Sequence, residues 1–198
     1  VTVATSAVRD AANAEDFLCS CTALLGSSPV VLNGTDEARL AFRGAVSDLP
    51  SGASVMAVDI GGGSTEISWG RVGQECVFAE SVDVGCVRLA ERFGLLDCPH
   101  EEDVARSRTF VRAALSAPLD RLERGARGVP LRVVASGGSA TTFAAMDQKL
   151  ACYDRARIHG YTGHSHVLRE TVPRLFGLTC GQRKGLPGVP ADRAAVLP

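Results

Sequence analysis

The sequence has few aromatic residues and no excess of charge of either sign, and each shortage excludes a class of ligand. Aromatic residues make up 5% of the 198 residues, so platforms that stack single-stranded nucleic acid are not expected. The 21 lysines and arginines nearly balance the 22 aspartates and glutamates, which leaves a formal net charge of -1. Bulk positive charge therefore cannot attract nucleic acid or an anionic membrane. An anionic ligand would have to be held by local backbone N–H groups, a few basic side chains or a metal ion.

Long apolar runs and paired metal-binding cysteines are also missing. No run reaches the ~18 apolar residues that a membrane-spanning helix needs. The seven cysteines are odd in number and include no Cys-x-x-Cys pair, so zinc-ligand spacing is absent. We expect them to be buried or idle thiols of a protein in the reducing cytoplasm. The remaining composition, with 45% hydrophobic and 22% charged residues, is ordinary for a globular chain of one domain or two small ones.

The first 50 residues alternate between apolar strand-like runs and helical segments. The predicted elements are strands at 1–4 and 29–32, a helix at 7–12, a helix opened by Asn13, and a helix from a Thr35 cap to about Gly44. This order is typical of an α/β layer. Ser51 and Gly52 follow a proline and precede a shift in composition. We therefore expect the chain to divide into 1–50 and 51–198.

The second part of the chain also mixes strands and helices. A strand is predicted at 55–58, hairpin arms at 67–69 and 76–79, a strand at 131–135, and helices at 87–93, from about 100, at 140–146 and at 167–176. Pro118 should kink or split the helix that begins near residue 100. Pro173, by contrast, is expected to lie within a continuing helix. The whole pattern predicts the α/β fold class.

The stretch from Asp59 to Glu66 is the most informative motif. An apolar strand ends in an acid, and three glycines, Ser64 and Thr65 follow it. Glycines let successive N–H groups approach one phosphate closely, and the two hydroxyl groups can add donors. Asp59 and Glu66 offer the carboxylate oxygens that Mg²⁺ prefers. No Gly-Lys-Ser/Thr follows, so this is not a Walker loop; the alternative is a glycine-rich start of a hairpin whose acid is merely solvated.

A second glycine turn repeats this theme. Ser136, Gly137, Gly138 and Ser139 follow an apolar strand and precede a helix. A helix N-terminus after glycines binds anions readily, although such turns are common in α/β proteins. Two such turns in one chain indicate a phosphate site, and they could face each other across a cleft.

Glu37 and Arg9 are ambiguous when they are considered alone. Glu37 lies in the first turn of a predicted helix, where an acid also stabilises the helix dipole. Arg9 follows a Thr-Ser cap; its planar guanidinium matches phosphate, but it could equally be a solvated helix residue.

Four stretches link these residues to a known family. They are Ala4 to Asn13, Gly34 to Leu40, Val58 to Glu66 and Val84 to Leu89, and the Ser136–Ser139 turn and the tail from Leu186 to Ala194 agree with them in order and spacing. The chain resembles, over essentially its whole length, the exopolyphosphatase/guanosine pentaphosphate phosphatase (Ppx/GppA) family in its actinobacterial form. The ordered set is highly specific, although no single stretch is.

The resemblance implies an actin-like ATPase (ribonuclease H-like) fold with two lobes around a phosphate-binding cleft. It implies a phosphohydrolase that releases terminal phosphate from inorganic polyphosphate, and in many members also from guanosine pentaphosphate, with Mg²⁺. The roles carried over by motif are water activation for Glu37, the metal and water network for Asp59 and Glu66, and phosphate binding for Arg9, for Gly61, Gly62, Gly63, Ser64 and Thr65, and for Ser136, Gly137, Gly138 and Ser139.

The chain departs from the family pattern at its start. Family members open with a further strand and an Asp-x-Gly-Ser-Asn-Ser-like phosphate loop, which this sequence lacks. We therefore expect a member truncated at the N-terminus, with 1–50 as the C-terminal part of the first lobe and 51–198 as the second. Because the first lobe would have unpaired strand edges and exposed apolar surface, we expect either marginal folding of the chain alone or a homodimer that covers the gap. The alternatives are a non-catalytic polyphosphate- or nucleotide-binding remnant and an actin-like kinase.

Overall fold

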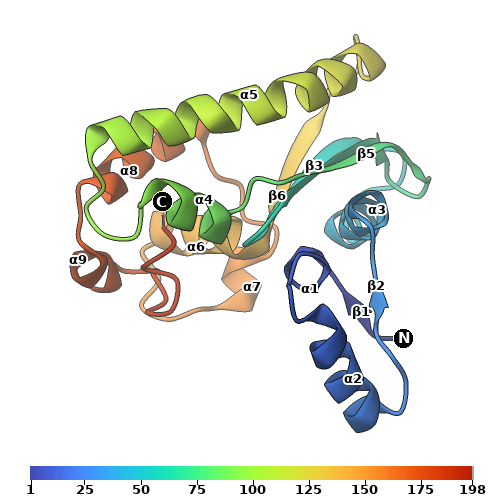
Figure 1. Ribbon diagram of the computed structural model, residues 1–198. Coiled ribbons are helices and arrows are strands. Elements are labelled where there is room, and N and C mark those ends of the chain that lie inside the picture. The colour runs from blue at the N-terminus through green and yellow to red at the C-terminus, as the bar shows by residue number, and fades with distance from the viewer. Residues whose placement is uncertain (198) are drawn as a thin grey trace.

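A four-stranded sheet organises the larger part of the protein. The computed structural model describes residues 1–197. Its sheet has the order β5-β4-β3-β6 (Figure 1), where β3 is Ser54–Ile60, β4 is Thr65–Arg71, β5 is Cys76–Val82 and β6 is Arg132–Ser136. β3, β4 and β5 form an antiparallel meander, and β6 joins β3 in parallel. The predicted strands and hairpin are confirmed.

Helices cover both faces of this sheet (Figure 1). On one face, α3 (Gly34–Ala45) packs Phe42 against Val55 and Ala57 of β3. On the other face, α5 (Glu101–Gly125) packs Leu122 against Ile67 of β4. Because side chains alternate along a strand, these contacts fix which residues of each strand point toward α3.

A small parallel sheet precedes this core. β1 (Val3–Ala4) pairs with β2 (Val30–Val31), and α1 (Ser6–Arg9) and α2 (Ala14–Leu25) lie between them in the chain. α1 follows β1, and α3 follows β2 after two residues. Since the strands are parallel, α1 and α3 begin at the same end of this sheet.

The cap of α3 differs from the prediction. Asn33, not Thr35, occupies the N-cap, and its Oδ1 accepts a hydrogen bond of 2.9 Å from the backbone N–H of Asp36. Asparagine accepts this bond as well as threonine does. Because the helix begins at Gly34, Thr35 lies inside the first turn.

The prediction that Pro118 kinks or splits a helix is wrong as to the split. α5 runs without interruption from Glu101 to Gly125, and Pro118 lies buried within it. Val104 on one side of the proline and Leu122 on the other are both buried in separate apolar clusters. This packing offsets the ~3 kcal/mol that an internal proline costs a helix.

The remaining helices follow the predictions more closely. α4 (Cys86–Phe93) and α8 (Ser165–Phe176) lie where they were expected, the latter through Pro173. α6 (Gly137–Asp147) begins three residues early, at the second glycine turn. The short helices α7 (Arg155–Ile158) and α9 (Cys180–Lys184) carry no periodicity that predicts them. The division of the chain near residue 50 stays a prediction.

No helix among residues 1–197 combines the length and the apolar character that crossing a bilayer requires.

Candidate active site

Four polar side chains form a row across the sheet on the face that α3 covers. Asp59 at the end of β3 is the Cα partner of Glu66 on β4 and of Ser136 on β6. Glu66 is in turn the partner of Ser81 on β5. Directly paired residues share one face, so the two carboxylates point to the same side. The sheet therefore brings the two predicted metal ligands together.

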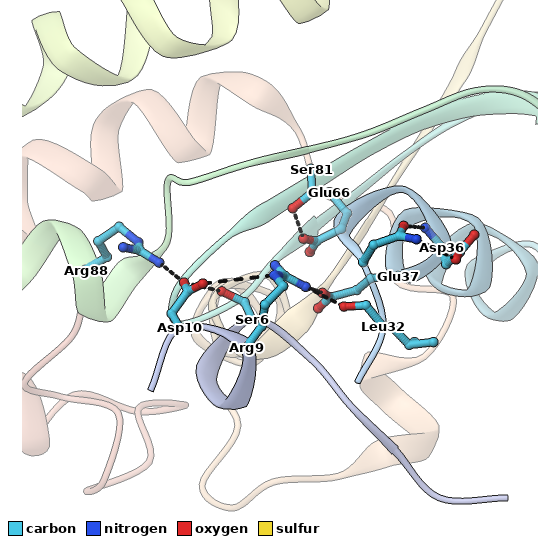
Figure 2. Close-up of polar contacts among 10 residues, drawn as sticks. Ser6, Arg9, Asp10, Leu32, Asp36, Glu37, Glu66, Ser81 and Arg88 are labelled. Atoms are coloured by element: carbon cyan, nitrogen blue, oxygen red, sulfur yellow. Dashed lines mark hydrogen bonds and ion pairs between the residues drawn. The ribbon is translucent and has the colours of Figure 1, made fainter. Parts of the chain in front are cut away.

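Glu66 is held in place and protected from solvent. Its side chain is only 4% exposed, and its Oε1 accepts a hydrogen bond of 2.7 Å from the Ser81 hydroxyl (Figure 2). Burial raises the pKa of Glu66, and the carboxylates of Glu37 and Asp59 raise it further, against the opposing effect of hydrogen bonds from Ser81 and Ser64. The three carboxylates of Glu37, Asp59 and Glu66 therefore place negative charges close together in a partly buried site.

Asp59 also lies in a partly buried environment. Burial raises the pKa of Asp59, while a hydrogen bond from Ser136 opposes this shift. The second glycine turn therefore touches the first site directly through its leading serine. A cation bound between these carboxylates would favour their charged forms.

Glu37 of α3 and Arg9 of α1 form an ion pair. The Arg9 Nη1 donates to Glu37 Oε2 at 3.2 Å and to the Leu32 carbonyl at 2.8 Å (Figure 2). The parallel pairing of β1 with β2 explains this contact, because α1 and α3 begin at the same end of that sheet. The Arg9 side chain is 27% exposed and the Glu37 side chain is 15% exposed. Arg9 is thus a partly buried side chain with two partners rather than a freely solvated helix residue.

The glycine loop after β3 presents its backbone in one direction. The carbonyls of Gly61 and Gly62 accept hydrogen bonds of 3.0 Å from the N–H groups of Cys86 and Val87 at the start of α4. In a trans peptide the C=O and the next N–H point in opposite directions. The N–H groups of Gly62 and Gly63 therefore point away from α4. Within the described chain, neither of them donates a hydrogen bond. Free, aligned N–H groups of this kind bind anions.

Close contacts explain the glycines around this loop. A Cβ on Gly63 would lie 2.8 Å from the hydroxyl oxygen of Ser6, and a Cβ on Gly85 would lie 2.4 Å from the carbonyl oxygen of Gly62. The first contact shows that α1 packs on the loop. The second shows that α4 can cap the loop only if Gly85 has no side chain.

The second glycine turn lies beside the first, not across a cleft from it. β6 is the immediate parallel neighbour of β3, so both turns follow the carboxyl ends of adjacent strands. Gly137 has a φ of +89°, and a Cβ there would lie 2.3 Å from the carbonyl oxygen of Ile60. The prediction that the turns face each other was wrong because their strands pair directly. Gly138 and Ser139 lie in the first turn of α6 rather than in a loop.

Arg193 is a site residue to which the sequence assigns no role. A Cβ on Gly138 would lie 2.0 to 2.1 Å from the atoms of the Arg193 guanidinium, so this cation rests directly on the N-terminal turn of α6. Arg193 makes no ion pair among residues 1–197. It lies in a turn-rich tail, and only that tail's likeness to the family could have drawn attention to it.

The donor set fits Mg²⁺ with few protein ligands. Among residues 1–197, no group of three or more His, Cys, Asp or Glu side chains is arranged to hold a metal ion. Asp59 and Glu66, however, are paired carboxylates on one face. Mg²⁺ commonly uses one or two carboxylates together with water and substrate phosphates. The residues present therefore suit a metal that arrives with a phosphate ligand.

Known proteins resemble this chain in sequence and fold. Exopolyphosphatase 2 of Mycobacterium tuberculosis (strain CDC 1551 / Oshkosh) is 41% identical over 98% of this chain, which covers 61% of that protein. Exopolyphosphatase 1 of Mycobacterium bovis is 34% identical over 96% of the chain and is covered to 55%. The solved structure of the Aquifex aeolicus PPX-GPPA enzyme matches 98% of the chain with 33% identity and a TM-score of 0.78, and 62% of that structure is covered. The chain thus spans about 60% of these relatives' length.

The fold and the family follow from these matches. The likeness to the solved enzymes confirms the actin-like ATPase fold that the sequence resemblance implies. The model of the Ppx/GppA phosphatase family matches residues 1–198, the full length of the sequence. The chain belongs to the Ppx/GppA phosphatase family.

Proposed function

We propose that the protein is an exopolyphosphatase, which hydrolyses the terminal phosphoanhydride bond of inorganic polyphosphate. The observation that supports this most strongly is the placement of Glu37 beside Arg9 and near the carboxylates of Asp59 and Glu66. The site thus combines a base, a cation and anionic metal ligands next to free loop N–H groups. The names of the mycobacterial relatives agree with this activity.

The proposed reaction is an in-line attack by water on the terminal phosphorus. Glu37 accepts a proton from the water as the new P–O bond forms. The bridging P–O bond breaks, and its electron pair goes to the phosphate that now ends the shortened chain. Orthophosphate leaves as the second product.

The chain's own donors would bind the phosphoryl oxygens. Donors are present after two strands: the N–H groups of Gly62 and Gly63 lie in the loop after β3, and the N-terminal turn of α6 follows β6. Arg9 uses Nη1 for Glu37 and Leu32, and its Nη2 makes no hydrogen bond within residues 1–197. Arg193 would supply a second cation at the Gly138 turn.

We propose that Mg²⁺ is the metal and that Asp59 and Glu66 hold it. When bound, the ion would neutralise negative charge on the phosphoryl oxygens. The raised pKa of both carboxyls supports this assignment. Burial raises the pKa of Asp59, and burial together with the nearby carboxylates of Glu37 and Asp59 raises that of Glu66. A bound cation would relieve both effects.

Guanosine pentaphosphate is a second proposed substrate. It carries the same terminal phosphoanhydride, and the resemblance to the Ppx/GppA family implies this substrate for many members. The actin-like kinase differs in transferring the phosphoryl group to an acceptor other than water. The non-catalytic alternative predicts binding of polyphosphate without release of phosphate.

Hydrolysis in water enriched in ¹⁸O separates these possibilities. The protein is incubated with long-chain polyphosphate and Mg²⁺, and the released orthophosphate is analysed by mass spectrometry. One ¹⁸O atom per released phosphate supports the proposal. Binding without release would favour the non-catalytic alternative, and phosphate transfer that requires an acceptor would favour the kinase. Parallel reactions with guanosine pentaphosphate compare the two substrates.

We further propose a cytoplasmic homodimer. Apolar side chains are exposed around the small sheet and α2, namely Val3, Phe17, Leu24, Leu25 and Val30. Burial of such a patch against a second copy would stabilise the dimer. The seven free cysteines agree with a reducing compartment. Light scattering during size-exclusion chromatography tests the dimer.

A further inference from the structure

Arg88 makes two contacts that no other side chain of α4 makes. Its Nε donates a hydrogen bond of 2.7 Å to the carbonyl oxygen of Gly63, and its Nη2 donates to Asp10 Oδ2 at 2.5 Å. Figure 2 shows the side chain extending from its helix toward Asp10. Arg88 therefore joins the glycine loop to the segment that carries Arg9.

The first contact completes the orientation of the glycine loop. The backbone N–H groups of α4 hold the carbonyls of Gly61 and Gly62, and the Arg88 side chain holds the carbonyl of Gly63. The Gly63 carbonyl shares its peptide plane with the N–H of Ser64, so this bond turns the Ser64 N–H away from α4 as well. Three consecutive N–H groups then point to one side, and Arg88 controls the third.

The second contact reaches the other half of the site. Asp10 Oδ2 also accepts a hydrogen bond of 3.3 Å from Ser6, and Asp10 Oδ1 lies 4.0 Å from Arg9 Nε. Arg9 in turn donates to Glu37. A continuous chain of polar contacts thus runs from α4 through α1 to α3 (Figure 2).

We infer that Arg88 is a positioning residue that aligns the Ser64 N–H and, through Asp10, the Arg9 guanidinium on one phosphoryl group. This inference rests on the proposed function, since it assumes a phosphate ligand in the loop. Arg88 itself is not expected to touch the reacting atoms. Its effect is to hold two donors, from segments far apart in the sequence, in a fixed relation.

The planar guanidinium is needed for this role. Arginine presents its donors in a rigid fork, so Nε and Nη2 can hold two acceptors at once. A lysine has a single ammonium nitrogen and cannot reproduce both contacts in the same geometry. Arg88→Lys is therefore expected to retain only part of this positioning role. Arg88→Met keeps much of the apolar stem but should retain none of it.

The test measures tripolyphosphate binding by calorimetry with Mg²⁺ present. The protein carries Glu37→Gln, so that the ligand is not hydrolysed. Adding Arg88→Met should weaken binding about tenfold, the loss typical of one misplaced charge-assisted contact. Asp10→Asn should weaken it by less, and the double variant should bind no worse than Arg88→Met alone, because both act through one chain of contacts.

The matched control is Arg92→Met on the same helix. Arg92 lies one turn after Arg88 and stacks on Phe110, away from the loop. Arg92→Met should leave the affinity for tripolyphosphate unchanged within error, even if it lowers the melting temperature as much as Arg88→Met does. In the protein with Glu37 intact, Arg88→Met should raise KM for polyphosphate more than it lowers kcat.

The outcomes separate this inference from the proposed function. If the protein with Glu37→Gln alone binds no tripolyphosphate, the proposed function fails and Arg88 has nothing to position. If that protein binds and Arg88→Met binds equally well, only the positioning role is wrong. Equal losses of affinity and stability for Arg88→Met and Arg92→Met would reduce Arg88 to a structural residue. If Arg88→Met does not fold, the affinities of Arg88→Lys and Asp10→Asn for tripolyphosphate are compared with that of Arg92→Met instead.

Discussion

Asp59 and Glu66 face each other across β3 and β4, so that the antiparallel register alone places two carboxylates on the face covered by α3. The glycine loop between them is the connection that makes this pairing possible. A short motif in the sequence therefore becomes a compact pair of acids with a phosphate-binding backbone at its side. Glu37, carried in by α3, adds a third carboxylate from outside the sheet.

Neutralising Glu66 should stabilise the protein in the absence of metal. The raised pKa of Glu66 means that the folded state holds this proton more tightly than the unfolded chain does. Stability from this group is therefore present at low pH and is lost as the pH rises from the ordinary value of 4.5 through the raised value. Glu66→Gln keeps an oxygen for the Ser81 hydroxyl and removes the charge.

Thermal melting with a chelator present checks this expectation. Glu66→Gln should raise the melting temperature at neutral pH and should change it less at acidic pH. Glu75→Gln, at an exposed position, serves as the control. A Glu66→Gln protein that melts lower than its parent at neutral pH would show that the crowding of carboxylates is not destabilising.

Arg193 should contribute to substrate binding although it lies near the end of the described chain. Arg193→Met removes the cation that rests on the Gly138 turn, and we expect the affinity for tripolyphosphate to fall about tenfold. Arg127→Met, at an exposed position after α5, should have no effect. Equal affinities for both variants, measured by calorimetry, would remove Arg193 from the site.

Gly85 should be intolerant of even a methyl group. Gly85→Ala places a Cβ 2.4 Å from the Gly62 carbonyl oxygen, so α4 and the glycine loop must separate. We expect weaker phosphate binding and lower stability. Gly44→Ala, in open space within α3, should instead stabilise the protein by about 0.5–1 kcal/mol, since alanine favours the helix. Chemical denaturation measures the stability of both variants. A Gly85→Ala protein as stable as its parent would contradict the close packing of loop and helix.

The cap of α3 can be tested with two alanine substitutions. Asn33→Ala should cost about 1 kcal/mol of stability, because it removes the side chain that accepts from the Asp36 N–H. Thr35→Ala should have a much smaller effect, because Thr35 caps nothing. The reverse order in denaturation experiments would restore the prediction made from the sequence.

Local patterns in the sequence predicted the parts of the site that depend on neighbours in the chain. The apolar run at 55–58, followed by an acid and three glycines, allows few structures other than a buried strand with a tight loop. The hairpin that brings Ser81 back to Glu66 follows from the turn at Gly70 to Gln74 for the same reason. Helix starts were less certain, because Asn33 and Thr35 are both good caps and only packing chooses between them.

Contacts between distant segments could not be predicted in this way. The parallel pairing of β6 with β3, which sets the two glycine turns side by side, depends on tertiary packing. The guanidinium of Arg88 on the Gly63 carbonyl and that of Arg193 on Gly138 leave no local pattern in the sequence. Pro118 was misjudged for a similar reason, since burial on both sides of it keeps α5 continuous.

The role of Glu37 is the most direct test of the proposed active site. Phosphate release from long-chain polyphosphate with Mg²⁺ is compared for the parent and Glu37→Gln, with Glu15→Gln in the first turn of α2 as the matched control. A general base contributes ~10²–10⁴-fold, so Glu37→Gln should lower kcat by that factor while Glu15→Gln leaves it unchanged. Phosphate release by Glu37→Gln at the parent's rate would contradict the account.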